Sequence, residues 1–428
     1  NKNYKIDFAL AEGATLAIGG LSAGAAPSWI TVNGGAAYCN DQGWIFTART
    51  LANTKEIAAH GDKVPNAPLE AVGITSVGDP ESGNDSLAAA STAVFALNHE
   101  VSEPATVAIG AGESAATFRL KGGTAEKPVV YGAIGEGPAP MLTASFAASR
   151  PADWAPAGDG LWRLVPSVSP DVGAMWFDGE KSVGFKKDSR EDVRNDLDFH
   201  CDRKTRTTLV KSGRNPAERF SSVELSLGVH GLEIRGADGL VVDGLHVRGA
   251  GNHGLSSGDA TNVVIRNCTF DRIGGAELYV SEFGKHIRFG NAIEFWGNAI
   301  NVLVESNRFD QVYDAALTHQ CSERGQVQRN LSWRGNRVSR CEYSFEYWQH
   351  GEDAVTENVL VEGNVFEDAG YGFGHRQRWN PNAGHLILQD NTAATKNFVF
   401  RRNVFGRSLD RGIRLFNDWH GALRFEGN

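Results

Sequence analysis

The chain has 428 residues, of which 41% are hydrophobic, so the sequence can supply a sizeable core. Its net charge of −9 excludes the overall basic footprint of a nucleic-acid-binding protein, and we expect no nucleic-acid partner. No apolar run of about 18 residues occurs, so we expect no membrane span. Binding of an anionic substrate would need a local cluster of Arg, Lys and His.

The start of the chain and its cysteines bear on where the protein works. The chain begins at Asn1 rather than at Met, and removal of a signal peptide would explain this, so we expect a secreted or periplasmic protein. The 5 cysteines are too few and too scattered for a disulfide framework, and they show no zinc-type spacing. We favour buried thiols over a disulfide between Cys321 and Cys341.

The first half of the chain shows three stretches of different character. Residues 1–101 are rich in Ala and Gly with weak periodicity, and we expect them to cap one end of the fold. Residues 102–143 contain alternating strand-like segments joined by turns, which predict early coils. Residues 144–220 lack this pattern and predict an insertion or small subdomain. Residues 221–428 are then the main region, which we expect to carry the site.

A repeat dominates the second half. Each copy is a short alternating stretch with the two-residue period of a β-strand, followed by a turn. Apolar spacing of the helical type is absent. The copies are residues 242–247, 265–270, 304–309, 333–338, 361–366 and 400–405. Successive copies, including a partial one at the end of the chain, are separated by 23, 39, 29, 28, 39 and 25 residues. Strands recurring at this interval predict coils stacked in parallel, as in a solenoid.

An asparagine occupies the turn of four copies, at Asn307, Asn336, Asn364 and Asn403. Asn tolerates left-handed backbone, and its amide can bond to the same group one coil away. We therefore predict an asparagine ladder at one corner of the coils, with a structural role.

A second, shorter strand follows each copy and supplies the predicted functional face. These strands are residues 254–256, 292–294, 316–318, 344–346, 372–374 and 412–414. The two longer intervals imply insertions at about 274–290 and 377–397. Long loops on a solenoid tend to lie on its binding face.

These segments together resemble a known group of proteins. The region from Phe220 to Leu415 resembles the right-handed parallel β-helix proteins of the pectate-lyase-like superfamily. The resemblance rests on residues 231–234, 263–267, 291–296, 313–320 and 372–378, and residues 122–132 look like the entry coil. It implies an all-β fold, a right-handed parallel β-helix with inserted loops. It also implies polysaccharide lyase, glycoside hydrolase, epimerase, esterase or tailspike functions, without choosing among them.

Stacking the short strands predicts a row of outward side chains that includes two carboxylates. With Ile293, Leu317 and Phe345 facing inward, Glu294 and Glu346 face outward two coils apart, so their backbones lie about 9.6 Å apart. Inverting glycosidases separate their two carboxyl groups by roughly 6.5–9.5 Å, and retaining ones by about 5–5.5 Å. Asp314, at the corner between these coils, is a third candidate.

Side chains for binding a sugar surround these carboxylates. Trp296 and Trp348 follow Glu294 and Glu346 by two residues, and Gln320 lies between them in the same column. An aromatic ring can stack on a sugar face beside the acid. Further candidates are His375, with Arg376 or Arg378 to clamp a uronate or a sulfate. His319 is a candidate catalytic residue, although strict alternation would point it into the core.

Structural interpretations compete with each of these assignments. The glutamates can be solvated residues paired with Arg or Lys, and the tryptophans can pack under the first insertion. Asp314 can be a turn residue. Arg376 and Arg378 can pair with Asp390 or Asp418. Tyr279, Glu282, Lys285 and His286 in the first insertion are weaker candidates.

The sequence favours a glycoside hydrolase acting on a polysaccharide or oligosaccharide, with Glu294, Asp314 and Glu346 as acid and base or nucleophile. One alternative is a polysaccharide lyase or uronate epimerase that uses Arg, His and a bound cation. Another is a non-catalytic glycan-binding or tailspike-like protein. No cofactor is required for the favoured function, calcium is possible, and we expect a monomer.

Overall fold

The computed structural model describes residues 118–428 except 134–137, 167–170, 391–393, 418 and 420–421, and before them only the backbone of strands β1 to β9. The first seven of these strands pair among themselves, as in the antiparallel pair β1 with β4. They are β1 (Thr15–Gly20), β2 (Ser28–Val32), β3 (Gly35–Cys39), β4 (Trp44–Arg49), β5 (Ile74–Ser76), β6 (Thr92–Ala93) and β7 (Phe95–Leu97). The predicted cap, residues 1–101, otherwise lies outside the described residues.

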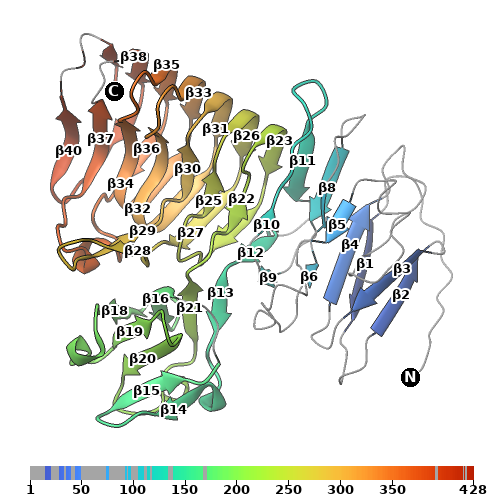
Figure 1. The fold of residues 1–428 in the computed structure, drawn as a ribbon, viewed down its shortest axis with the longest axis vertical. Helices are drawn as coiled ribbons and strands as arrows, with labels where there is room; N and C mark the ends of the chain where they lie inside the picture. Colours follow the sequence, from blue (N-terminus) through green and yellow to red (C-terminus); the bar gives the residue numbers. More distant parts are fainter. Residues whose placement is uncertain are drawn as a thin grey trace.

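The main body is a stack of parallel coils, and each coil contributes strands to three faces (Figure 1). The first face is a sheet of its own. It consists of β8 (Ala105–Ile109), β11 (Val129–Ala133), β23 (Ala237–Asp243), β26 (Ala260–Arg266), β31 (Ala299–Glu305), β33 (Val327–Arg334), β35 (Val355–Glu362), β38 (Thr395–Arg401) and β41 (Leu423–Glu426).

The second and third faces merge because two long strands, β32 (Arg308–Cys321) and β34 (Arg337–Gln349), run from one onto the other. The second face also has β9 (Glu113–Ala115), β12 (Met141–Thr143), β24 (His246–Arg248), β27 (Thr269–Ile273), β36 (Val365–Glu367) and β39 (Val404–Phe405). The third face also has β10 (Phe118–Arg119), β22 (Leu232–Glu233), β25 (Leu255–Ser257), β30 (Ile293–Trp296), β37 (Gly384–Asp390) and β40 (Arg411–Phe416). This arrangement is the predicted parallel β-helix.

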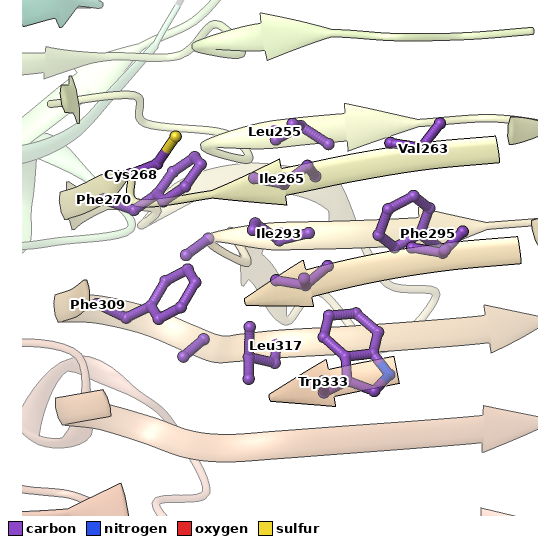
Figure 2. Packing of buried hydrophobic residues seen from close by; sticks show 14 of the residues in the cluster. Leu255, Val263, Ile265, Cys268, Phe270, Ile293, Phe295, Phe309, Leu317 and Trp333 are labelled. Atoms are coloured by element: carbon purple, nitrogen blue, oxygen red, sulfur yellow. The ribbon is translucent and has the colours of Figure 1, made fainter. Parts of the chain in front are cut away.

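One continuous hydrophobic core fills the coils. Leu255, Ile293 and Leu317 pair in register on successive strands of the third face and are fully buried. Figure 2 shows them lying in line and facing the same interior as Val263 and Ile265 from the first face. Burying a Leu or Ile side chain is worth about 1.5–3 kcal/mol. The alternating pattern of the sequence therefore fixes which residues of the third face point outward.

The predicted asparagine ladder is confirmed. The Oδ1 atom of Asn336 accepts hydrogen bonds from the backbone N–H of Asn307 at 3.0 Å and from its side-chain amide at 3.1 Å. The same contacts join Asn336 to Asn364, Asn364 to Asn403, and Asn403 to Asn428. The left-handed residue is, however, the one before each asparagine, such as Gly335 with φ 58°.

A second asparagine ladder, which the sequence did not predict, runs along the outside of the first face. Each member has a positive φ between 51° and 59°. The amide of Asn262 donates to Asp238, and every later amide donates to the side-chain oxygen of the asparagine one coil earlier. Its members are Asn262, Asn301, Asn330, Asn358 and Asn397. Asn is one of the few residues that adopts left-handed backbone readily, which explains its recurrence here.

The predicted strand at residues 372–374 is wrong. The coil after β34 is completed by β37, in which Leu386 pairs with Phe345 and Ile387 pairs with Glu346. Residues 371–383 form a loop that contains the short 3-10 helix η5 (His375–Gln377). Phe373 packs on Trp176 with ring centroids 5.0 Å apart instead of entering the core of the coils. The insertion thus precedes the third-face strand instead of following it.

Residues 145–227 form a subdomain of mainly antiparallel strands that leaves the coils after β12, and Figure 1 shows it projecting from one side of the stack. We call it the inserted subdomain. It has its own core around Met175, Phe177 and Phe199. One sheet has β13 (Ser145–Ala147), β21 (Val223–Leu227), β16 (Val172–Phe177) and β17 (Ser182–Val183). The other has β14 (Trp154–Pro156), β15 (Leu161–Leu164), β20 (Thr207–Lys211), β19 (Asp198–Asp202) and β18 (Phe185–Lys186). The helical turns are η3 (Pro151–Asp153), η4 (Arg190–Asp192) and α2 (Pro216–Arg219).

The first insertion is a hairpin of β28 (Ala276–Val280) and β29 (His286–Phe289). Cys321 and Cys341 are buried thiols, so the alternative disulfide between them is not formed. In the described residues, no helix has the length and hydropathy needed to cross a membrane.

Candidate active site

The pairing of the third face sets Glu294, Thr318 and Glu346 in one row. Glu294 on β30 pairs with Thr318 on β32, and Thr318 pairs with Glu346 on β34. Neighbouring strands lie about 4.8 Å apart, so the two glutamate backbones are about 9.6 Å apart. The next strand of this face, β37, places the apolar Ile387 beside Glu346, so the row of polar side chains is interrupted there.

Glu294 is held by two nitrogen groups and is almost fully buried, with 7% of its surface exposed. Its Oε2 atom accepts a hydrogen bond from the Asn291 amide at 2.5 Å and lies 3.3 Å from Nε2 of His253. Burial raises the pKa of Glu294 to about 7, and the charge of Asp314 adds to the increase. Glu294 therefore holds a proton over part of the neutral range.

Glu346 is partly exposed and is contacted on one carboxyl oxygen. Its Oε2 atom accepts hydrogen bonds from the Gln320 amide at 3.1 Å and the Thr318 hydroxyl at 3.4 Å. Desolvation raises the pKa of Glu346 to about 8, with further contributions from the charges of Asp314 and Glu294. The raised pKa favours the protonated form of Glu346 at neutral pH, on a face that solvent reaches.

Asp314 lies at an irregularity of β32, where Tyr313 and Asp314 occupy the register opposite Glu342. An extra residue of this kind bends a strand and re-aims its side chains. The carboxylate of Asp314 pairs with the Arg378 guanidinium, with 3.1 Å between Oδ1 and the nearest nitrogen. Arg378 is itself positioned over the rings of Tyr313 and Tyr343. The site thus combines an ion-paired aspartate with two glutamates whose pKa values are raised toward neutral pH.

Glu342 anchors the loop of residues 371–383 to the coils. Its side chain is fully buried, and its oxygens contact Nδ1 of His375 at 3.1 Å and the backbone N–H of Asn382 at 3.0 Å. Burial raises the pKa of Glu342. His375, predicted to bind substrate, is therefore engaged in holding this loop.

Two tryptophans form an aromatic shelf beside the carboxylates. Trp296 and Trp348 are 40% and 38% exposed, and each lies two residues beyond the glutamate of its strand. They flank Gln320 in the same register column. We call Trp296 and Trp348 the tryptophan shelf.

The structure corrects the assignment of His319 as a catalytic residue. Its side chain is fully buried and faces the core, because the strand keeps its strict alternation at this position. Its Nδ1 atom is 2.7 Å from Oε1 of Gln328, and its ring stacks on Trp333. Burial lowers the pKa of His319 to about 4, so the ring is neutral at pH 7. Because it faces the core, it lies on the opposite side of the strand from Glu294 and Glu346.

An open pocket of about 430 Å³ lies beside Asp314, because its lining includes Tyr313 and the Arg378 side chain that pairs with Asp314. Tyr313 and Arg378 belong to both the site and this pocket. Arg376, predicted as a clamp, is exposed on its wall. The remaining lining comes from residues 185–195 of the inserted subdomain, from β29 and from residues 377–379. We call this the basic pocket.

Sequence reasoning named Arg376, Arg378 and His286 of the basic pocket but missed His253, Asn291 and the wall that the inserted subdomain supplies. His253 and Asn291 stand just before short strands, where nothing in the repeat distinguishes them from turn residues. The pocket walls come from segments far apart in the chain. Among the described residues, no group of three His, Cys, Asp or Glu side chains could hold a metal ion.

Comparisons with known proteins address the fold. Residues 219–405 match the family model described as a right handed beta helix region. No curated protein matches the chain. A structure described as the complex of XylC with xylose is similar at 10% identity with a TM-score of 0.48, over 73% of this chain and 63% of that chain. One described as a glycoside hydrolase is similar at 10% identity with a TM-score of 0.41, over 76% of this chain and 89% of that one.

The family match and the strand pairing cover the same segment of the chain. The matched residues begin just before β21 and end at β39, and they include every strand that carries the candidate carboxylates. Residues 219–405 are therefore a right-handed parallel β-helix region, and the candidate active site lies on its third face.

Proposed function

We propose that the protein is a glycoside hydrolase whose site is formed by Glu346, Asp314 and Glu294. The observation that carries this proposal is the grouping of an ion-paired aspartate with two glutamates in one row, whose pKa values burial raises, next to the tryptophan shelf. Glycosidases need one carboxylic acid that donates a proton and one carboxylate that acts as base or nucleophile. Carboxyl groups whose environments separate their protonation states fit these two roles.

Glu346 is the proposed general acid. Its Oε2 atom already accepts two hydrogen bonds, so its proton resides on Oε1 and can be passed to a glycosidic oxygen. Asp314 is the proposed base or nucleophile, because Arg378 provides a cation for its carboxylate. Glu294 is the most deeply buried of the three, and we assign it a supporting role in maintaining the charge of the site.

A polysaccharide or oligosaccharide is the proposed substrate. The exposed rings of Trp296 and Trp348 can stack on sugar faces, and their two-coil separation offers contacts to more than one sugar unit.

The test is digestion of a panel of glycans, read by mass and by ultraviolet absorbance. A hydrolase adds water to each cleaved bond and gives products without the conjugated double bond of an unsaturated uronate. We expect Glu346→Gln and Asp314→Asn each to lower kcat by about 10²–10⁴-fold. Glu367→Gln, an exposed glutamate on the second face, is the matched control and should keep full activity.

Two outcomes would contradict the proposal. Products that absorb in the ultraviolet would assign the site to β-elimination, as in a lyase. Glycan binding without turnover under all conditions would make the protein a non-catalytic binder.

A further inference from the structure

The basic pocket is lined by Tyr313 of β32 and by three further parts of the chain, which hydrogen bonds and a cation–π contact hold together. The backbone N–H of Lys186 in the inserted subdomain donates to Oε1 of Gln377 at 3.1 Å, and the Gln377 amide donates to the carbonyl of Gly184 at 3.1 Å. These bonds attach the loop of residues 371–383 to the inserted subdomain. The hairpin joins them through the cation–π contact of Lys285 with Trp379, at 4.0 Å. The pocket is thus a preformed feature of the fold.

Basic side chains dominate the lining of this pocket. Its only acidic members among the described residues are Asp188 and Asp192. Its six Lys and Arg members are Lys186, Lys187, Arg194, Arg288, Arg376 and Arg378. The chain as a whole has a net charge of −9, so this local excess of positive charge comes from how the fold gathers these side chains.

Ion pairs inside the protein occupy most of these cations. Arg288 pairs with Asp188, and Arg194 is near Asp192 at 3.7 Å. Three other cations of the lining pair with carboxylates that do not line the pocket. Lys186 pairs with buried Asp171 at 2.8 Å, Lys187 with Asp198 at 3.3 Å, and Arg378 with Asp314 at 3.1 Å.

Arg376 differs from the other cations. It is exposed on the pocket wall, and within the described part of the chain it has no acidic partner within 4.0 Å. Its guanidinium therefore remains available for an incoming anion, and a planar fork of N–H donors suits a carboxylate or a sulfate.

The pocket and the tryptophan shelf lie on opposite sides of the carboxylates. Along β32, Tyr313 lines the pocket, Thr318 lies in the row of Glu294 and Glu346, and Gln320 lies between the shelf tryptophans. At about 3.3 Å per residue, Tyr313 and Gln320 are about 23 Å apart along the strand. A bound glycan that contacts both therefore extends to either side of the carboxylates.

We propose that the basic pocket is a binding subsite for an anionic sugar group, with Arg376 as its principal contact. The anion is a uronate carboxylate or a sulfate ester on one sugar of the glycan, while a neutral part of the same glycan stacks on the tryptophan shelf. This inference deepens the proposed function, because it rests on the third face being a glycan site. It assigns the substrate class: a glycan that carries acidic groups.

The experiment measures binding to the Glu346→Gln variant, which keeps the fold and slows turnover. The probes are immobilised glycans in matched pairs: oligogalacturonates with their carboxyl-reduced counterparts, and sulfated galactans with their desulfated counterparts. We expect at least one acidic member to bind about tenfold or more tightly than its neutral partner, with the preference decreasing as salt is added. The uronate and sulfate pairs identify which anion is recognised.

Two further variants assign the preference to the pocket. Arg376→Ala in the Glu346→Gln background should remove the preference for acidic glycans and leave the affinity for neutral ones unchanged. Arg163→Ala, an exposed arginine of β15 outside the pocket lining, should leave both unchanged. Trp348→Ala should weaken both members of a pair to a similar degree.

The subsite proposal is overturned if no acidic glycan is preferred, or if a preference survives Arg376→Ala. Hydrolysis of neutral glycans without an acidic preference would overturn the subsite and leave the hydrolase assignment intact. An acidic preference that depends on Arg376, in a protein that cleaves none of these glycans, would support the subsite and count against hydrolysis.

Discussion

His253 and Glu294 are joined through Nε2 of the imidazole, which lies 3.3 Å from the Oε2 atom of the carboxyl group. The other ring nitrogen, Nδ1, accepts a hydrogen bond from the backbone N–H of Asn291 at 3.0 Å. Burial lowers the pKa of His253 to about 4, so the ring is neutral and its one proton resides on Nε2. Oε2 of Glu294 thus faces two N–H groups, and a proton on Glu294 must be on Oε1.

Replacing His253 should change the protonation of Glu294. His253→Phe keeps an aromatic ring against His230, whose ring stacks on His253 at 5.3 Å, but removes the N–H group. Because that N–H group stabilises the charged carboxylate, we expect the pKa of Glu294 to rise by about one unit. A ¹³C NMR titration of the glutamate carboxyl carbons measures it, with His200→Phe in the inserted subdomain as the control. An unchanged pKa would show that the contact has no electrostatic role.

The raised pKa values of Glu294 and Glu346, about 7 and about 8, should make the protein less stable as the pH rises. Above pH 4.5 the unfolded chain loses these protons while the folded protein keeps them. Taken alone, these two groups lower the free energy of unfolding as the pH rises from about 4.5 to 8, by up to about 1.4 kcal/mol per pH unit for each group, and their contribution dominates only above pH 6.5. Denaturant unfolding between pH 6.5 and 8 should show a shallower decline for Glu346→Gln than for the wild type.

The same measurement below pH 6.5 should reverse the slope. His253, His230 and His319 are buried, and their pKa values are lowered to about 4. The unfolded chain binds protons at these groups first, so stability is lost as the pH falls from 6.5 toward 4. If the decline above pH 7 is equally steep in Glu346→Gln, the assignment of that proton to Glu346 is wrong.

Glu342 should control the loop of residues 371–383 and not the chemistry directly. Glu342→Gln weakens the contact with His375 but keeps a side-chain oxygen that can accept the hydrogen bond from the backbone N–H of Asn382. We expect a loss of about 1–3 kcal/mol in the local stability of the loop. Hydrogen exchange should show faster exchange in residues 371–383 and unchanged exchange in β31 and β33. Uniformly faster exchange would instead indicate a global structural role.

The two asparagine ladders should differ in energetic weight. Asn336→Ala leaves the buried N–H of Asn307 and the carbonyl of Val304 without their partners, and each such group costs about 1–3 kcal/mol. Asn330→Gly in the exposed ladder keeps the left-handed backbone, and water can replace the lost bonds, so we expect less than about 1 kcal/mol. Denaturant midpoints compare the two. Equal losses would contradict this difference.

The sequence predicted the features that repeat from one coil to the next. The in-register positions of Ile293, Leu317 and Phe345 follow from a two-residue period, and the ladder follows from a recurring asparagine. Residues 372–374 were wrongly predicted as a strand, because Gly372, Phe373 and Gly374 imitate that period while Phe373 packs on the inserted subdomain.

The site was predictable only in part. Glu294 and Glu346 emerged from the repeat, but His319 obeys the alternation that buries it. The basic pocket depends on contacts such as that between Lys186 and Gln377, which are 191 residues apart in the chain. A local sequence pattern cannot predict such a contact, because it depends on how the inserted subdomain packs against the coils.

The inserted subdomain begins and ends on adjacent strands, where β13 pairs with β21 and Phe146 lies opposite Leu225. A segment whose two ends are already held side by side can be exchanged without changing the path of the chain that receives it. Evolution could therefore replace this wall of the pocket as a unit while Glu294, Asp314 and Glu346 stay on their coils. If the proposed function holds, relatives with the same coils and a different insertion would keep the three carboxylates but present a different pocket wall to their ligands.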